Sequence, residues 1–197
     1  MSFSTVKEFE EKIADFYGAP YAVAVDCCTH AIELCLRYKN PSYVTFPNRT
    51  YISIPFLGDK LGIEWDWNIS EWEDTYTIGS TNIVDAAVRW REGSYVAGTL
   101  MCLSFQFQKH LSLGRGGMIL TDNKEDALVL KRMSYDGRLP DKPWRDQNIG
   151  SMGYHYYMTP ETAQQGLDKL EEAKARTPKK WGWEEWPDLR NMEVFKK

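Results

Sequence analysis

The sequence predicts one α/β domain in which a mostly parallel sheet is flanked by helices. Short apolar runs of strand length alternate along the chain with longer segments whose apolar residues recur at helical spacing. Size and composition agree with this fold class. The 197 residues are 43% apolar and 26% charged, which is ordinary for a globular domain with a sizeable core.

An amphipathic helix is expected at the start of the chain. Residues 5–17 carry one apolar face, Thr5 and Glu8 have the spacing of a capping box, and Gly18 is placed to end the helix. The elements expected next are, in order, a buried strand at 21–25, a helix after Thr29, a strand at 42–46, a helical segment at about 52–61 and a strand near Ile63.

The second half of the chain continues the alternation. The expected elements are, in order, strands at 82–87 and 98–105, a turn at 114–117, a strand at 118–121, a helix from Asp122 to about Met133, and a helix that begins at Thr159-Pro160-Glu161. Residues 1–176 are expected to form the α/β domain. Residues 177–197, rich in Trp, Lys and Glu and without clear periodicity, are expected to form a C-terminal tail.

Charge and composition argue against several classes of protein. The 24 basic and 28 acidic residues give a net charge of −4, which disfavours a general nucleic-acid or membrane-surface binder. No apolar run approaches the length of a membrane span and no signal-peptide pattern is present, so a cytoplasmic protein is expected. The four cysteines match no zinc spacing, and we expect free thiols and no metal site.

The strongest chemical signal lies in the window 103–117. A strand delivers Ser104 and, five residues later, Lys109, before the glycine-rich turn Gly114-Arg115-Gly116-Gly117. Pyridoxal phosphate needs a lysine amine for its aldehyde, a cradle for its phosphate and an acid beside its pyridine nitrogen. Asp85, at the end of an apolar strand, supplies such an acid. Each residue alone is typical of a solvated turn, but the combination predicts a cofactor site.

These residues belong to a longer series of motifs in a fixed order. The segments are Phe9–Tyr17 with Gly18 and Tyr21–Val25, Asp26-Cys27-Cys28-Thr29-His30-Ala31, Pro47-Asn48-Arg49-Thr50-Tyr51, Asp85-Ala86-Ala87, Ser104–Gly117 and Gly153-Tyr154-His155-Tyr156-Tyr157-Met158. Over residues 8–170 the sequence thereby resembles the DegT/DnrJ/EryC1/StrS aminotransferases, which aminate nucleotide-linked keto sugars with pyridoxal phosphate.

The resemblance implies the large domain of the aspartate-aminotransferase-like fold (fold type I) and assigns roles to individual residues. Lys109 would carry the cofactor as a Schiff base and move protons, and Asp85 would keep the pyridine nitrogen protonated. The other implied cofactor-binding residues are Cys28, Thr29 and Ser104 at the phosphate, Tyr51 stacked on the ring, and His155, which would reach the phosphate of a neighbouring subunit. The implied partners are an amino donor such as glutamate, a nucleotide-sugar substrate and a second copy of the chain in a homodimer with shared sites.

Several positions depart from the family pattern. Cys28 replaces a glycine, and Val88 stands where Gln or His often contacts the phenolic oxygen of the cofactor. Arg115 stands where an acidic residue is common, while His155 and Tyr157 replace Asn and Arg. One branch of the family replaces the lysine with histidine and dehydrates sugars. Here a lysine occupies that register, which favours transamination.

Length is the largest departure. The segment between Tyr51 and Asp85 is too short for the strand and helix that normally precede the acidic motif, and the small C-terminal domain is expected to be absent. An alternative is therefore a catalytically reduced module that binds the cofactor, or a protein partner, without turnover. A sugar- or nucleotide-binding domain that does not use pyridoxal phosphate is less favoured, because the glycine turn lacks a P-loop pattern.

Overall fold

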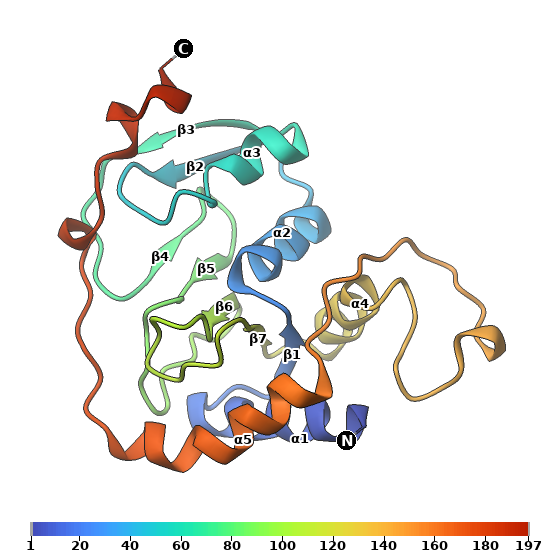
Figure 1. Cartoon of the computed structure of the whole chain (residues 1–197). Coiled ribbons are helices and arrows are strands. Elements are labelled where there is room, and N and C mark those ends of the chain that lie inside the picture. The colour runs from blue at the N-terminus through green and yellow to red at the C-terminus, as the bar shows by residue number, and fades with distance from the viewer. Residues whose placement is uncertain (1, 197) are drawn as a thin grey trace.

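A five-stranded sheet with the strand order β1-β7-β6-β5-β4 forms the centre of the molecule (Figure 1). The computed structural model describes residues 2–196. The strands of this sheet are β1 (Tyr21–Val25), β4 (Tyr76–Thr77), β5 (Ile83–Asp85), β6 (Leu100–Ser104) and β7 (Gly117–Thr121). A separate parallel pair consists of β2 (Tyr43–Pro47) and β3 (Glu64–Asn68).

The five-stranded sheet is mixed, so the expectation of a mostly parallel sheet is wrong. Among its strands only β5 and β6 pair in parallel, whereas β1–β7, β6–β7 and β4–β5 pair in antiparallel fashion. A parallel neighbour requires a crossover, usually a helix, and no helix is described between Ser104 and Gly117. The chain therefore returns directly, and β7 runs back along β6.

Helices cover both faces of the sheet. Figure 1 shows α1 (Phe3–Tyr17) beside α5 (Pro160–Ala175) on one face, and α2 (Cys28–Lys39) with α4 (Lys124–Ser134) on the other. The remaining helices are short: α3 (Phe56–Leu61), η1 (Trp144–Asp146), η2 (Trp183–Glu185), η3 (Leu189–Asn191) and η4 (Glu193–Phe195). No helix in the described part of the chain is long and apolar enough to cross a membrane.

The strand side chains alternate between two apolar cores. In β6, Met101 and Leu103 belong to the core with α1 and α5, while Leu100 and Cys102 belong to the core with α2. The strand β7 alternates in the same way. Because both faces are covered, these strands are continuous apolar runs in the sequence rather than alternating ones.

Some expected boundaries differ from the structure. The first helix begins at Phe3 with Ser2 as its N-cap, so the prediction that Thr5 starts the helix with a capping box is wrong. Gly18 ends the helix in the left-handed conformation, as predicted (φ 75°). The sequence did not predict β4. The segment between Tyr51 and Asp85, although short, does contain a helix and two strands, α3, β3 and β4.

The C-terminal residues lie along the β2–β4 side of the molecule (Figure 1). Trp183 N–H donates to the Trp72 carbonyl oxygen (3.1 Å), and Leu189 N–H donates to the Asn48 carbonyl oxygen (2.8 Å). Leu189 is buried. These backbone hydrogen bonds hold the predicted tail against the domain, while the division at residue 176 stays a prediction.

Gly117 allows two parts of the chain to approach closely. In the sheet it lies between Val25 of β1 and Ser104 of β6. A Cβ atom at this position would lie 2.5 Å from the carbonyl carbon of Cys27 and 2.6 Å from the amide nitrogen of Cys28. Glycine therefore brings the start of α2 next to the end of β6.

The substitution Gly117→Ala is expected to reduce the free energy of unfolding by roughly 1–3 kcal/mol, because the added methyl group meets backbone that cannot rotate away. Urea unfolding measures this. Gly150→Ala is the matched control, since a Cβ atom there meets no heavy atom within 4 Å, and its effect should stay within about 0.5 kcal/mol. Equal losses in the two variants would contradict the close approach.

Candidate active site

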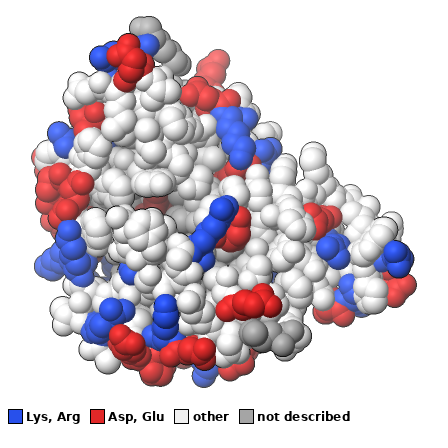
Figure 2. Space-filling model, in the orientation of Figure 1, with Lys and Arg blue, Asp and Glu red and all other residues white. Residues whose placement is uncertain are grey.

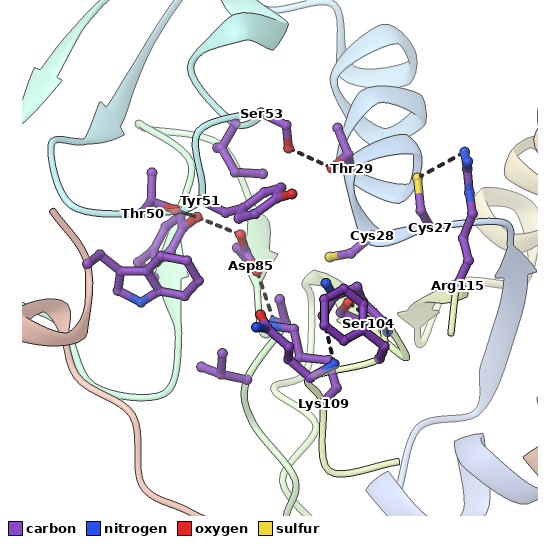
Figure 3. A pocket seen from close by; sticks show the side chains of 18 of the residues that line it. Cys27, Cys28, Thr29, Thr50, Tyr51, Ser53, Asp85, Ser104, Lys109 and Arg115 are labelled. Atoms are coloured by element: carbon purple, nitrogen blue, oxygen red, sulfur yellow. Dashed lines mark hydrogen bonds between the residues drawn. The ribbon is translucent and has the colours of Figure 1, made fainter. Parts of the chain in front are cut away.

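A cavity of about 420 Å³ lies where β5 and β6 end and α2 begins. In Figure 2 the same face of the molecule is hollowed, and the side chains around the hollow are mostly uncharged. The predicted site residues that line the cavity are Cys28, Thr29, Tyr51, Asp85, Ser104 and Lys109 (Figure 3). Its volume lies in the range of roughly 300–1,000 Å³ that is typical of sites for small ligands and cofactors.

Asp85 is the acid of this cavity. It is the last residue of β5 and only 5% exposed. Its Oδ2 accepts a hydrogen bond from the Tyr76 hydroxyl at 2.5 Å, and its Oδ1 accepts one from Ala87 N–H at 2.9 Å. Burial raises the pKa of Asp85, and these two hydrogen bonds and the nearby charge of Lys109 oppose that increase.

Lys109 follows β6 in a compact loop. Its N–H donates to the Gln106 carbonyl oxygen (2.8 Å), and Leu113 N–H donates back to Phe105 (2.9 Å). The ammonium nitrogen lies 5.6 Å from the ring centre of Trp181 and 5.7 Å from that of Trp186. Burial lowers the pKa of Lys109, while the Asp85 charge opposes this. More of the uncharged, nucleophilic amine is therefore present near neutral pH than for a solvated lysine.

The start of α2 offers donors for an anion. Cys27 precedes the helix in an extended conformation without a side-chain capping bond, so no side chain there accepts from the first-turn N–H groups. The Thr29 and Ser53 hydroxyls are 2.7 Å apart, and the Ser104 hydroxyl accepts from Gln106 N–H at 3.4 Å. A helix N-terminus with nearby hydroxyls is suited to a phosphate group.

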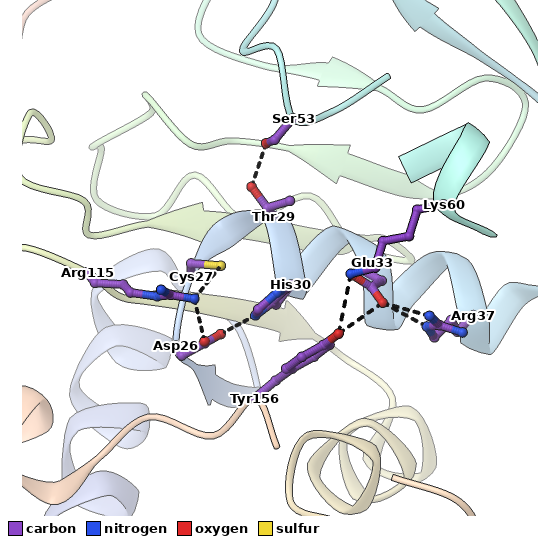
Figure 4. Close-up of polar contacts among 10 residues, drawn as sticks. All are labelled: Asp26, Cys27, Thr29, His30, Glu33, Arg37, Ser53, Lys60, Arg115 and Tyr156. Carbon is purple, nitrogen blue, oxygen red and sulfur yellow. Dashed lines mark hydrogen bonds and ion pairs between the residues drawn. The ribbon is translucent and has the colours of Figure 1, made fainter. Parts of the chain in front are cut away.

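Arg115 adds a positive charge at the rim of this cradle. Its guanidinium contacts the Asp26 carboxylate at 2.8 Å, and the residue lines the cavity (Figure 4). The same carboxylate bonds His30 Nδ1 at 2.6 Å, and the His30 ring stacks on Tyr156. Although burial alone would lower the pKa of His30, hydrogen bonds with Asp26 and Cys27 raise it to about 9. Two cationic side chains therefore share the Asp26 carboxylate.

The outer wall of the cavity is aromatic and apolar. Tyr51 lines it and is 53% exposed, and the Tyr51 and Trp186 rings meet edge-on at 6.2 Å. Val88 also lines the cavity and presents only methyl groups. Sequence reasoning missed Ser53, Tyr76 and Trp186, which lie outside the motifs. The richness of residues 177–197 in Trp was the one sequence signal that pointed to Trp186.

His155 lies outside the cavity. It is exposed, and its Nδ1 is 3.1 Å from Asp136 Oδ2. The segment before it, which contains η1, projects from the body of the molecule (Figure 1). His110, which directly follows Lys109 in the sequence, does not line the cavity either. Its ring forms a hydrogen bond with the Ala173 carbonyl oxygen (2.8 Å) and stacks on Trp90.

Comparison with known proteins adds to this geometry. The sequence model of the DegT/DnrJ/EryC1/StrS aminotransferase family matches residues 1–54 and 91–181. The matched parts carry the α2 cradle and Lys109, whereas Asp85 lies in the stretch between them. An uncharacterized protein of Methanocaldococcus jannaschii is 22% identical over 220 residues, which cover 85% of this chain and 57% of that protein.

Solved structures of similar fold include the following two. AtS13 from Actinomadura melliaura is 20% identical in sequence and superposes with a TM-score of 0.73. The match covers 88% of this chain and 61% of the AtS13 chain. The sugar aminotransferase CalS13 from Micromonospora echinospora is 17% identical with a TM-score of 0.69, covering 86% of this chain and 61% of its own. This chain spans about three fifths of the length of each of these three relatives. Because the family model matches well over half of its residues, the chain belongs to the DegT/DnrJ/EryC1/StrS aminotransferase family.

Proposed function

We propose that this chain is a pyridoxal-phosphate-dependent aminotransferase that acts on a nucleotide-linked keto sugar, with an amino acid such as glutamate as the donor. The observation that carries the proposal is the meeting of Lys109, Asp85 and the α2 N-terminus in one cavity. Family membership supports the reaction type, and the description of CalS13 as a sugar aminotransferase supports the substrate class.

The donor set of the cavity fits pyridoxal phosphate. The α2 N-terminus, with Cys28, Thr29 and Ser104, would hold the phosphate. Asp85 retains lone pairs on both oxygens beyond its two accepted hydrogen bonds, and a pyridine N–H needs such an acceptor. When bound, the cofactor supplies an electron sink for the negative charge that develops beside the amino group.

The side chains of the cavity have separable tasks in this reaction. Lys109 would hold the cofactor through its amine, and as a free amine its Nζ would accept and return a proton as a general base and acid. Asp85 would hold a proton on the pyridine nitrogen by accepting its hydrogen bond. Tyr51 would cover the cofactor ring, and Trp186 would help to exclude water from the Lys109 amine.

A homodimer with shared sites is part of the proposal. The projecting segment around η1 carries Trp144, Ile149 and Met152, which are exposed by 57%, 42% and 76%. Large apolar side chains exposed together are the kind of surface that a partner buries. In this arrangement His155, at the end of the same segment, would donate to the cofactor phosphate of the neighbouring copy.

The second candidate function is a catalytically reduced module that binds the cofactor, or a protein partner, without turnover. Val88 favours it, because a valine cannot donate a hydrogen bond to the phenolic oxygen of the cofactor. The exposed Tyr51 also favours it, since half of its surface is open to solvent. In an aminotransferase or a cofactor-binding module, residues 1–176 would bind the cofactor, and residues 177–197 would cover one side of the cavity through Trp186.

Pyridoxal phosphate added to the purified chain is expected to give the visible absorbance band of the lysine-bound cofactor. Lys109→Ala should abolish the band, whereas Lys12→Ala, at an exposed lysine of α1, should leave it intact. Loss of the band on adding glutamate, and its return with a nucleotide-linked keto sugar, would support transamination. A band that glutamate does not change favours the cofactor-binding module. No band in the unaltered chain contradicts cofactor binding and leaves only the module that binds a protein partner.

The pH dependence of Lys109 reactivity gives a separate prediction. Because burial lowers the pKa of Lys109, its acylation by a small anhydride should reach its maximum at lower pH than acylation of the lysine in a short unstructured peptide. The Asp85 charge raises that pKa, so Asp85→Asn should move the Lys109 profile to still lower pH. Peptide mass spectrometry over a pH series measures both profiles. A Lys109 profile that coincides with that of the peptide lysine would contradict burial of the Lys109 amine.

A further inference from the structure

We propose that Tyr76 is a positioning residue for Asp85: it orients the buried carboxylate and stabilises its charge, and Thr50 holds Tyr76 in place. This inference rests on the proposed function, because the oriented carboxylate is the group that would accept the pyridine N–H. The juxtaposition itself is a property of the chain without any ligand.

The strand register brings the two side chains together. β4 and β5 run antiparallel, with Tyr76 directly opposite Asp85. Directly opposed residues project from the same face of a sheet, so their side chains meet. The Tyr76 hydroxyl lies 2.5 Å from Asp85 Oδ2 and 2.5 Å from the hydroxyl of the buried Thr50. The Trp72 ring packs at 5.0 Å against the Tyr76 ring and limits its movement.

The direction of the hydrogen bonds follows from the donors available. An ionised carboxylate only accepts, so Tyr76 donates its single hydroxyl proton to Asp85. Tyr76 must then accept from Thr50, which gives the order Thr50 to Tyr76 to Asp85. Burial and the Asp85 charge hold the pKa of Tyr76 well above its ordinary value, so it remains a donor at every pH at which the protein works.

The charge on Asp85 depends on few groups. Tyr76 approaches it from β4, Lys109 from the loop after β6, Cys28 from α2 and Cys102 from β6. Burial holds the pKa values of both cysteines well above their ordinary value, so they stay neutral near Asp85. Desolvation raises the pKa of Asp85. The hydrogen bond from Tyr76 is the largest influence that lowers this pKa, ahead of Ala87 N–H and the Lys109 charge. Removing it should therefore raise the pKa of Asp85.

The motifs of the family give no reason to expect this tyrosine. Tyr76 lies between the two matched parts of the chain, in a strand of two residues. Its alternative role is purely structural, as a pin that fastens the short β4 to β5. The two roles differ in what they predict for the titration of Asp85.

The test is a pH titration of the Asp85 carboxyl in the cofactor-free chain, followed by ¹³C NMR with aspartate labelled at the carboxyl carbon. Asp85→Asn assigns the signal. In Tyr76→Phe the midpoint should move to higher pH, and in Thr50→Val it should move in the same direction by less. Tyr17→Phe is the matched control, since it removes a buried hydroxyl that donates to the Arg89 carbonyl oxygen at 2.6 Å, and Tyr17 does not line the cavity.

A folded Tyr76→Phe variant with an unchanged Asp85 midpoint would overturn the inference. If that variant does not fold, Thr50→Val retains the Tyr76 ring and decides the question by the same midpoint. In the presence of pyridoxal phosphate, Tyr76→Phe should weaken cofactor binding about tenfold, as for a lost hydrogen bond to a charged group. Failure of the unaltered chain to bind the cofactor would refute the proposed function, whereas the cofactor-free titration would still decide the role of Tyr76.

Discussion

The parallel pairing of β5 with β6 is the constraint on which the site depends. Parallel neighbours end at the same edge of a sheet, so β5 ends at Asp85, opposite Cys102 of β6, and Ser104 and the loop with Lys109 follow at that edge. The antiparallel β7 starts from the same edge at Gly117, whose missing side chain admits the first turn of α2. One acid, one amine and one helix N-terminus thus converge although their positions in the sequence are far apart.

Burial shifts the pKa values of Asp85 and Lys109 and so determines how the two groups can react. Asp85 and Lys109 each lose hydration, which favours the neutral form of each, and the charge of each partly offsets that cost for the other. Asp85 receives further support from Tyr76, whereas the described contacts of the Lys109 amine are to indole rings. The acid is therefore fixed in place, while the amine stays adaptable enough to bond a ligand and to move a proton.

The sequence predicted those parts of the fold and site that are encoded locally. The strand at residues 21–25 was predicted correctly because it is a strong apolar run. Asp85, Ser104 and Lys109 were singled out by their motifs, and they line one cavity. The directions of the strands were predicted wrongly, because periodicity carries no information on strand pairing. The antiparallel return of β7 along β6 depends on the loop between them. Tyr76 was missed because a two-residue strand leaves no pattern, and Trp186 because its contact with Lys109 depends on the path of the C-terminal residues.

The most direct test of the account is to locate the bond between cofactor and chain. The protein is incubated with pyridoxal phosphate, reduced with borohydride, digested and analysed by mass spectrometry. The account predicts one reduced cofactor per chain, on the peptide that contains Lys109, and none in Lys109→Ala. A cofactor found on another lysine, or no retained cofactor at all, would contradict it.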